Sequence, residues 1–448
     1  MNQTRVLCEF LSRMTLEQIG KKNLLDIRYK TLDWLGCAIA AVDRSCARET
    51  LAMNREAGGN PQASGVGQAE RTSAQNAAFY NGLISHALEY DDTNKIAITH
   101  PGAPVIAAAL AVAEARKACF ADYALGVAAG YEAMIRMGGA INPDHYANWH
   151  TTGTCGTFAA AAGAARIMGL DSETTERAMG IASTMASGLI YVFGTDAKLV
   201  TVGNAARNGI VAAELAERGF TAPEDAFAGP KGYAQSAGGK EDLSFLVPRS
   251  GDRLMLEDAY YKIHASCGHT HSALDALQAL MEECRFRAEE VESVEIQVYR
   301  TAWELCADYK TDQESQAKFS LPFCAAVTLL RGQCTLAEFA PEVLHSPEVA
   351  EYAKRIRVRE NADYTAAYPK LRTERVILRL KDGRTMEKAV DLPKGKPPYS
   401  FIDQKYAALA GMTVTDECAA EIRETVLSLK NDTPIRVVGD AVRTLRRK

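Results

Sequence analysis

Alanine-rich segments with helical spacing fill most of the first 250 residues of this 448-residue chain, and they constrain its fold more than any other feature. The segment "NLLDIRYKTLDWLGCAIAAV" places Leu24, Ile27 and Leu35 on one face of a helix. Similar segments follow at residues 102–117, 156–171, 172–189 and 203–220. Strand-like alternation is scarce here, so the pattern predicts a bundle of helices over residues 1–262.

The pattern changes after residue 288, where apolar and polar residues begin to alternate. "VESVEIQVYR" and "RIRVRE" are typical of half-buried strands, and "ERVILRLKDGRTMEKAVDL" contains two such runs joined by Asp382-Gly383, a hairpin signal. Helical segments lie between them, which predicts an α+β domain with an antiparallel sheet over residues 263–398. Helical spacing returns over 399–448. We therefore expect a mainly α fold: a large all-helical bundle domain, discontinuous in sequence, with a smaller α+β domain inserted.

Composition excludes several classes of protein. The net charge of -5 and the scattered lysines and arginines argue against a nucleic-acid partner. No apolar run reaches the roughly 18 residues that a membrane-spanning helix needs, and the first residues lack the pattern of a secretion signal. The eleven cysteines form no CxxC pair, which is typical of reduced thiols in a cytoplasmic protein.

Seven of the eight histidines fall into three groups, and this clustering favours a functional site. The first group, in "HALEYDDTNKIAITHPGAPV", places Glu89, Asp91 and Asp92 between His86 and His100. A metal site, an acid–base site and an ordinary helix end are all compatible with these residue types. If this is an acid–base site, Glu89, Asp91 and His100 are the candidates for a catalytic role, and Thr93 is a candidate to contact substrate.

The second group, "HYANWHTTGTCG", leads into a helix through a turn rich in threonine and glycine. The free N–H groups at such a helix start suit a carboxylate or phosphate, so Tyr146, His150 and Thr152 are candidates to line a binding site for one, although an ordinary helix cap has the same pattern. Lys198 precedes the next helix start and Arg207 follows it, and a lysine with an arginine could hold an anionic substrate.

The third group, "YYKIHASCGHTHSALDA", contains Lys262, His269 and His271, which we expect to bind carboxylates. A zinc site at Cys267, His269 and His271 lacks the usual ligand spacing, and the cysteines lack iron–sulfur spacing. The chain also has no GxSxG, GxxxxGK[ST] or strand-flanked GxGxxG motif. The spacing therefore argues against a zinc or iron–sulfur site and against a nucleotide-binding loop.

Several long blocks, in order between about Asp33 and Gly332, resemble the MmgE/PrpD family: "HALEYDDT", "THPGAPVIAAALA", "WHTTGTCGTFAAAAGAARIMGLD", "KLVTVGNAARNGIVAAELAERGFTAPEDAF" and "KFSLPFCAAVTLLRG". Members include 2-methylcitrate dehydratase, cis-aconitate decarboxylase and iminodisuccinate epimerase. The resemblance implies a di- or tricarboxylate substrate, a homodimer, and no metal or organic cofactor.

The resemblance also implies roles for individual residues. The decarboxylase branch uses an acid, two histidines, a lysine and a tyrosine. The acid falls on Glu89, where that branch has aspartate, and the tyrosine position is Phe323. The histidines fall on His100 and His150, with one extra residue between Thr93 and His100, and the lysine falls on Lys198.

These residues suit a cofactor-independent dehydratase that acts on a citrate-like hydroxy acid such as 2-methylcitrate. His100 or His150 would take the proton next to a carboxylate, and the other histidine or Glu89 would assist the loss of water. An epimerase of a dicarboxylate is the first alternative. Decarboxylation of a cis-aconitate-like acid comes next, because Phe323 removes a phenol, and a carboxylate-binding protein without activity ranks last.

Overall fold

The computed structural model describes residues 2–249 and 251–448. Their internal contacts divide the chain into two compact units. One unit consists of Met1–Tyr261 together with Pro398–Lys448, and the other of Lys262–Pro397. Each is described by itself, and the domain boundaries at 262/263 and 398/399 stay a prediction.

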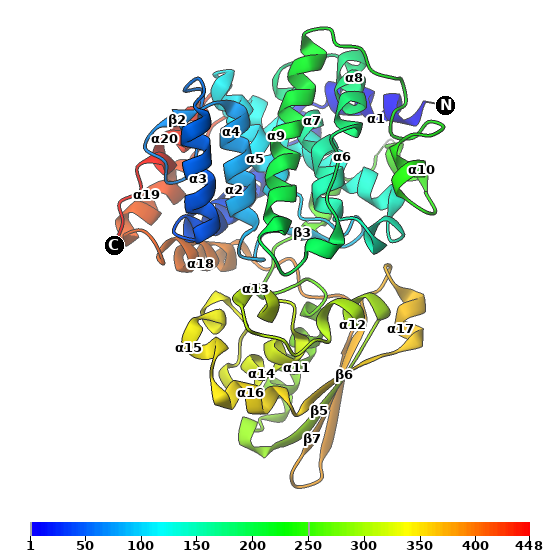
Figure 1. Cartoon of the computed structure of the whole chain (residues 1–448), viewed down its shortest axis with the longest axis vertical. Coiled ribbons are helices and arrows are strands. Elements are labelled where there is room, and N and C mark those ends of the chain that lie inside the picture. Colours follow the sequence, from blue (N-terminus) through cyan, green and yellow to red (C-terminus); the bar gives the residue numbers. More distant parts are fainter. Residues whose placement is uncertain (1, 250) are drawn as a thin grey trace. The chain divides into compact units, whose positions relative to one another are not determined.

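The first unit is built almost entirely from helices, so the expectation of a mainly α fold is confirmed (Figure 1). Its α-helices are α1 (Gln3–Arg13), α2 (Leu16–Ala41), α3 (Ser45–Ala57), α4 (Ala74–His86), α5 (Gly102–Ala115), α6 (Phe120–Ile141), α7 (Thr151–Ile167), α8 (Ser172–Ser183), α9 (Ala197–Glu217), α10 (Tyr233–Ala237), α18 (Tyr399–Ala410), α19 (Asp416–Leu427) and α20 (Arg436–Arg443). The bundle is not all-helical, because two antiparallel pairs of two-residue strands accompany it: β1 (Ala63–Ser64) with β2 (Arg71–Thr72), and β3 (Thr93–Asn94) with β4 (Ala259–Tyr260).

Small residues allow the central helices α4, α5, α7 and α9 to pack closely. A Cβ atom on Gly209 of α9 would lie only 2.4 Å from the Cβ of Ala160 in α7, and one on Gly82 of α4 would lie 3.3 Å from the Cβ of Ala206. The alanine-rich pattern therefore reflects helix-to-helix contact, where larger side chains would push the backbones apart.

The C-terminal segment packs back onto the N-terminal helices. Helix α18 lies against α2, and the rings of Tyr29 and Tyr399 stack with their centroids 4.0 Å apart. Residues distant in sequence thus share one core.

The second unit contains a four-stranded sheet of β5 (Val291–Val298), β6 (Ile356–Glu360), β7 (Glu374–Leu380) and β8 (Thr385–Val390), in the order β6-β5-β7-β8. Asp382-Gly383 joins β7 to β8, and Gly383 has a φ of 92°, which glycine adopts readily. The expectation of an antiparallel sheet is wrong for one pair, because β5 and β6 run parallel. A parallel pair needs a long crossover, and the segment between these strands provides it.

The helices of the second unit are α11 (His271–Cys284), α12 (Arg300–Cys306), α13 (Glu314–Ala317), α14 (Leu321–Arg331), α15 (Pro341–Leu344), α16 (Pro347–Ala353) and α17 (Ala362–Ala367). Helix α11 packs on β7 and β8, and helices α12 and α14 pack on β6. Alternate residues of β5 are buried, which agrees with the half-buried pattern of its sequence. Among the described residues, no helix combines the length and the apolar character that a membrane span requires.

Candidate functional site

The residues that we predict to be catalytic gather where the ends of four packed helices meet. His86 is the last residue of α4, and Glu89 and Asp91 lie in the loop that follows it. His100 lies just before α5, and His150 is the N-cap residue of α7. Lys198 lies in the first turn of α9. The close packing of these helices brings together side chains that lie as much as 112 positions apart in the sequence.

Asp91 joins two histidines of this cluster. Its Oδ2 atom lies 2.8 Å from Nδ1 of His86 and 3.4 Å from Nδ1 of His100, and the two ring centroids are 4.8 Å apart. Burial alone would raise the pKa of Asp91, but the neighbouring imidazoles of His86 and His100 hold it well below its usual range. Asp91 is therefore ionised at neutral pH and can stabilise positive charge on either ring.

Glu89 and Lys198 form a buried ion pair beside this triad. Glu89 adopts a left-handed backbone conformation with a φ of 53°, and its Oε1 atom lies 3.9 Å from Nε2 of His86. The ammonium group of Lys198 also lies 4.8 Å from the centre of the Phe193 ring. A buried charge is costly unless it is paired, so each of these two groups stabilises the charge of the other.

His150 completes the cluster. Its ring centroid lies 5.7 Å from that of His86 and 5.0 Å from that of Phe193. Burial lowers the pKa of His150 well below its usual value, and the positive charge of Lys198 lowers it further. His150 is therefore neutral at pH 7, as a general base must be.

Hydrogen bonds fix the position of His100. Its backbone N–H donates to the hydroxyl of Thr152 (3.1 Å). Nearby, Asp92 accepts hydrogen bonds from the N–H of Gly102 (2.8 Å) and the hydroxyl of Tyr131 (2.6 Å). Thr152, which we predict to bind substrate, thus also positions a predicted catalytic residue.

The segment between Thr93 and His100 forms a small closed turn. Asn94 and Thr99 exchange two backbone hydrogen bonds, and the Oδ1 atom of Asn94 accepts one from the N–H of Ala97 (2.8 Å). The hydroxyl of Thr93 donates to the carbonyl of Thr99 (3.0 Å). These hydrogen bonds close the turn at its base.

Two further predicted residues of the first unit lie at different distances from the cluster. The ring of Tyr146 lies 6.3 Å from that of Phe193, which itself contacts His150. The backbone of Arg207 lies nine residues along α9 from that of Lys198, which is about 13.5 Å along the axis at the rise of an α-helix. The guanidinium of Arg207 lies over the ring of Phe79. Its predicted role in carboxylate binding stays a prediction.

The remaining predicted residues belong to the second unit. Lys262 donates a hydrogen bond to the carbonyl of Ser266 (3.0 Å), and Nε2 of His271 lies 3.3 Å from the same oxygen. Nδ1 of His269 lies 2.6 Å from the hydroxyl of Tyr299. The carboxylate-binding role of these three side chains also stays a prediction.

Three potential metal ligands occur in the cluster. His86, Asp91 and His100 can each offer one ligand atom, and these atoms lie within 4.8 Å of one another. The shortest contact, from His86 to Asp91, has the length of an ordinary hydrogen bond, so a shared proton accounts for it. The expectation of a metal-free site stays a prediction.

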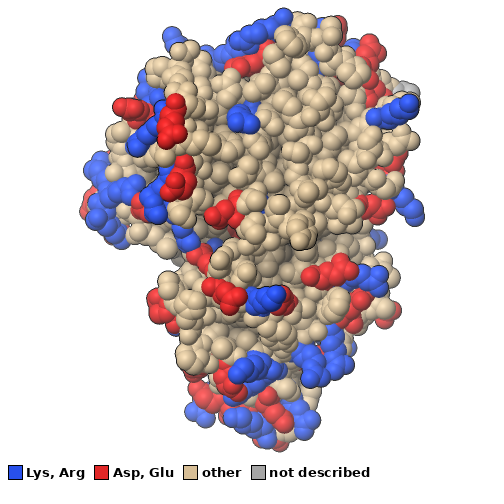
Figure 2. Space-filling view, viewed as in Figure 1, with Lys and Arg blue, Asp and Glu red and all other residues tan. Residues whose placement is uncertain are grey.

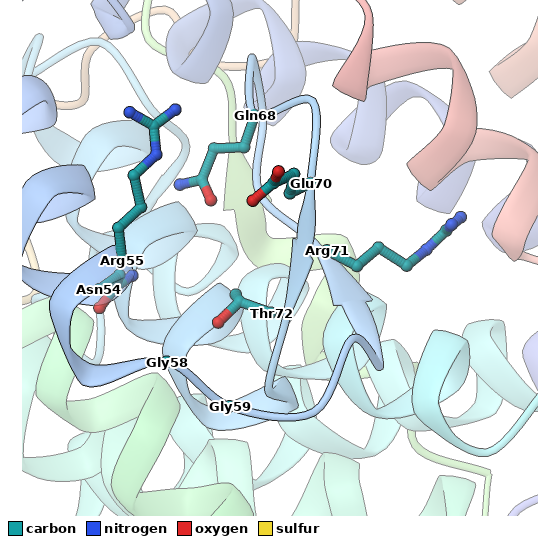
Figure 3. A pocket seen from close by; sticks show the side chains of 8 residues that line it. All are labelled: Asn54, Arg55, Gly58, Gly59, Gln68, Glu70, Arg71 and Thr72. Carbon is teal, nitrogen blue, oxygen red and sulfur yellow. The ribbon is translucent and has the colours of Figure 1, made fainter.

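A separate cavity of about 280 Å³ lies beside α3 and β2 (Figure 3). It is lined by Asn54, Arg55, Gly58, Gly59, Gln68, Glu70, Arg71 and Thr72. None of the predicted site residues lines it. The guanidinium of Arg71 forms an ion pair with Asp440, whose Oδ1 atom lies 2.5 Å from Nη2 of Arg71.

The order of the sequence blocks agrees with the comparison to known families. Residues 5–246 match the MmgE/PrpD N-terminal domain, and residues 264–431 match the MmgE/PrpD C-terminal domain. The chain belongs to the MmgE/PrpD family. The family resemblance that the sequence blocks indicate is thus confirmed.

This MmgE/PrpD protein is similar to several cis-aconitate decarboxylases. It is 27% identical to the enzyme of Aspergillus terreus over 464 residues, which covers 96% of this chain and 94% of the relative. It is 26% identical to the mouse enzyme over 329 residues, which covers 70% of this chain and 66% of the relative. A cis-aconitate decarboxylase-like protein of Aspergillus oryzae is 25% identical over 462 residues, which covers 97% of this chain and 96% of the relative.

Two residues of the cluster in this MmgE/PrpD protein were not among the predicted site residues. His86 lies at its centre, although the sequence marks it only as one member of a histidine group. Thr201 contacts the ring of His150, and no sequence signal identifies it. Phe323, at the tyrosine position, is buried in α14 of the second unit with its ring 5.6 Å from that of Phe339.

Proposed function

We propose that this protein is a lyase that acts on a citrate-like di- or tricarboxylic acid and moves a proton at a carbon next to a carboxylate. The observation that carries the proposal is the gathering of three histidines with one ion pair and one ionised aspartate. A carbon acid of this kind needs a base or acid for the proton and a cation for the developing negative charge.

Unsatisfied polar atoms in the cluster support a polar ligand. Nε2 of His86 and Oδ1 of Asp91 are buried and have no hydrogen-bond partner among the described residues. Buried polar atoms are nearly always hydrogen-bonded, so two such atoms in one cluster favour a ligand that supplies the missing partners. The imidazole of His100 is the most accessible of the three, with 15% of its side chain exposed.

Decarboxylation of a cis-aconitate-like acid is the first candidate reaction, because the relatives compared above carry that name. The bond to the departing carboxylate breaks, and its electron pair forms a new double bond as CO₂ leaves. The carbon at the far end of the old double bond then takes a proton. In this proposal His100, beside the ionised Asp91, donates that proton. Lys198 stabilises the negative charge that develops on the substrate before the proton is transferred.

Dehydration of a citrate-like hydroxy acid is the second candidate, and two observations favour it. His150 is neutral and can take a proton from carbon, which dehydration needs and decarboxylation does not. Phe323 also removes the phenol that the decarboxylase branch has at that position. Here the neutral His150 takes the proton, and His100 donates one to the leaving hydroxyl.

Product analysis with the purified protein separates these reactions. We expect cis-aconitate to yield CO₂ and an unsaturated dicarboxylate, measured by CO₂ release and proton NMR. Formation of an alkene from 2-methylcitrate or citrate without CO₂ would establish dehydration instead. Deuterium uptake from solvent without net product would indicate an epimerase, and no turnover of any of these acids would contradict the proposal.

A matched pair of histidine variants tests the cluster. His150→Ala should lower kcat by at least about 10²-fold, the usual contribution of an acid–base residue. His345 is the eighth histidine, is exposed and lies outside the three groups, so His345→Ala should leave kcat unchanged. Equal activity in both variants would exclude His150 from the reaction.

A further inference from the structure

We propose that Thr201 is a positioning residue that fixes the tautomer of His150, with the proton on Nδ1 and the free lone pair on Nε2. The catalytic consequence rests on the proposed function, in which His150 is a base. The tautomer itself can be measured whether or not that function is correct.

The hydrogen bonds of the Thr201 hydroxyl decide the tautomer. Its oxygen lies 2.7 Å from the backbone carbonyl of Lys198 and 2.8 Å from Nδ1 of His150. A carbonyl can only accept, so the single hydroxyl proton of Thr201 must point to Lys198. The hydroxyl oxygen is then an acceptor for His150, and Nδ1 must carry a proton.

Close packing prevents Thr201 from turning away. A Cβ atom on Gly153 would lie 3.0 Å from the Cβ of Thr201, and one on Gly188 would lie 3.2 Å from the same atom. Both positions therefore leave room for Thr201 only because they are glycines. The backbone N–H of His150 also donates to the carbonyl of Gly188 (2.9 Å), which holds the histidine against the same wall.

The surroundings of His150 keep its ring in the neutral form, in which the tautomer matters. Burial is the main factor that disfavours a positive charge on His150. Lys198 and the rings of His86 and His100 add to this effect, and Glu89 opposes it only in part. A neutral imidazole has one basic nitrogen. With the proton held on Nδ1 by Thr201, the basic nitrogen is Nε2.

The direct test is the protonation state of the two ring nitrogens. Protein with ¹⁵N-labelled histidine gives long-range proton–nitrogen correlations, and the His150→Gln variant assigns the His150 signals. In the wild type we expect a protonated Nδ1 and an unprotonated Nε2. In Thr201→Val, which keeps the shape but removes the hydroxyl, we expect the proton to appear on Nε2. Thr201→Ser should restore the wild-type pattern.

Thr328→Val is the control, because Thr328 is a buried helical threonine of the second unit whose hydroxyl also donates to a backbone carbonyl of its own helix, that of Cys324 at 2.8 Å. This variant should leave the His150 signals unchanged. With an acid that the enzyme turns over by proton abstraction, Thr201→Val should lower kcat by about 10-fold or more and change KM little. Thr201→Ser should recover most of that loss.

Two results would overturn the inference. One is a wild-type His150 that carries its proton on Nε2. The other is a Thr201→Val variant that keeps the wild-type tautomer. Absence of turnover with every acid would contradict the proposed function but would leave the spectroscopic test of Thr201 decisive.

Discussion

At the scale of single residues, the adjacent carboxyl groups of Asp91 and Asp92 differ in protonation because they face different neighbours. Asp91 faces two imidazole rings, which keep it ionised. Asp92 is buried, and this raises its pKa to about 6 although Lys30, Tyr131 and the N–H of Gly102 oppose the shift. Asp91 can thus supply negative charge to the site, while Asp92 holds the backbone beside it in place through hydrogen bonds.

Asp92 should make the stability of the fold depend on pH. Its pKa rises from 3.8 to about 6 on folding, so the folded state holds the proton more tightly and stability falls as pH rises between these values. The full effect of two pKa units is about 3 kcal/mol. In Asp92→Asn we expect a flatter pH dependence of the free energy of unfolding, measured by urea denaturation from pH 4 to pH 7. The exposed Asp312→Asn should keep the wild-type slope, and an unchanged slope in Asp92→Asn would contradict the argument.

The buried pair of Glu89 and Lys198 should be strongly coupled. Removing one partner leaves the other charge buried and unpaired, which costs about 3–5 kcal/mol. Glu89→Gln and Lys198→Met should therefore each destabilise the fold, and the double variant should lose less than their sum. A double-mutant cycle by chemical denaturation measures this coupling.

An exposed pair provides the control for that cycle. Arg177 and Glu173 are separated by one helical turn and lie 3.3 Å apart in solvent, so their coupling should be about 0.3–0.5 kcal/mol. A coupling of the same size for Glu89 and Lys198 would show that burial adds nothing to their interaction.

Removal of divalent metal ions should not change activity or stability if hydrogen bonds, and not a metal ion, join His86, Asp91 and His100. We expect dialysis against EDTA to change neither turnover nor the thermal unfolding temperature, and elemental mass spectrometry of the protein before dialysis to find no stoichiometric metal. Loss of activity that a divalent ion restores would contradict this and would assign the triad as its ligands.

The sequence predicts which residue types could form the site, but not all their contacts. Histidines beside acids and near helix starts indicated Glu89, Asp91, His100 and His150, and the structure places these side chains together. Thr201 could not be predicted because its contact with His150 depends on how α9 packs against α7. The catalytic roles of all these residues stay predictions.

At the scale of helices and strands, close helix contact depends on single glycines. A Cβ on Gly209 would meet the Cβ of Ala160 at 2.4 Å and the backbone nitrogen of Ala161 at 2.5 Å. Because the second of these atoms belongs to the backbone, α7 and α9 would have to separate. These two helices carry His150 and Lys198, so their spacing also sets the geometry of the site.

Gly209→Ala should therefore destabilise the fold by about 1–3 kcal/mol, the usual cost of overpacking, despite the better helix propensity of alanine. It should also lower turnover. Thermal and urea denaturation measure the first effect. Val211→Ala, at a half-buried position of the same helix, should cost less. A more stable Gly209→Ala variant would contradict the packing argument.

Strand position was easier to predict than strand direction. Alternation located all four strands of the second unit and Asp382-Gly383 located the hairpin. The parallel pairing of β5 with β6 was missed, because alternating burial describes the two faces of a strand and carries no information about the direction of its neighbour.

At the scale of the whole molecule, the predicted homodimer would need a surface that complements itself. Figure 2 shows a broad face with few charged side chains where α9 lies in Figure 1. Large apolar side chains are exposed just before and at the start of α9: Leu189 by 50%, Tyr191 by 92% and Val200 by 40%. A two-fold interface places the same patch of each chain against the other, so a patch with few charges limits repulsion between like charges.

We therefore expect light scattering after size-exclusion chromatography to give twice the 48.5 kDa mass of one chain. Tyr191→Asp would place two carboxylates across the two-fold axis and should shift the protein towards the monomer. Met412 is 57% exposed between α18 and α19, so Met412→Asp should leave the dimer intact. A monomeric wild type would contradict the homodimer, and a Tyr191→Asp variant as dimeric as Met412→Asp would place the interface elsewhere.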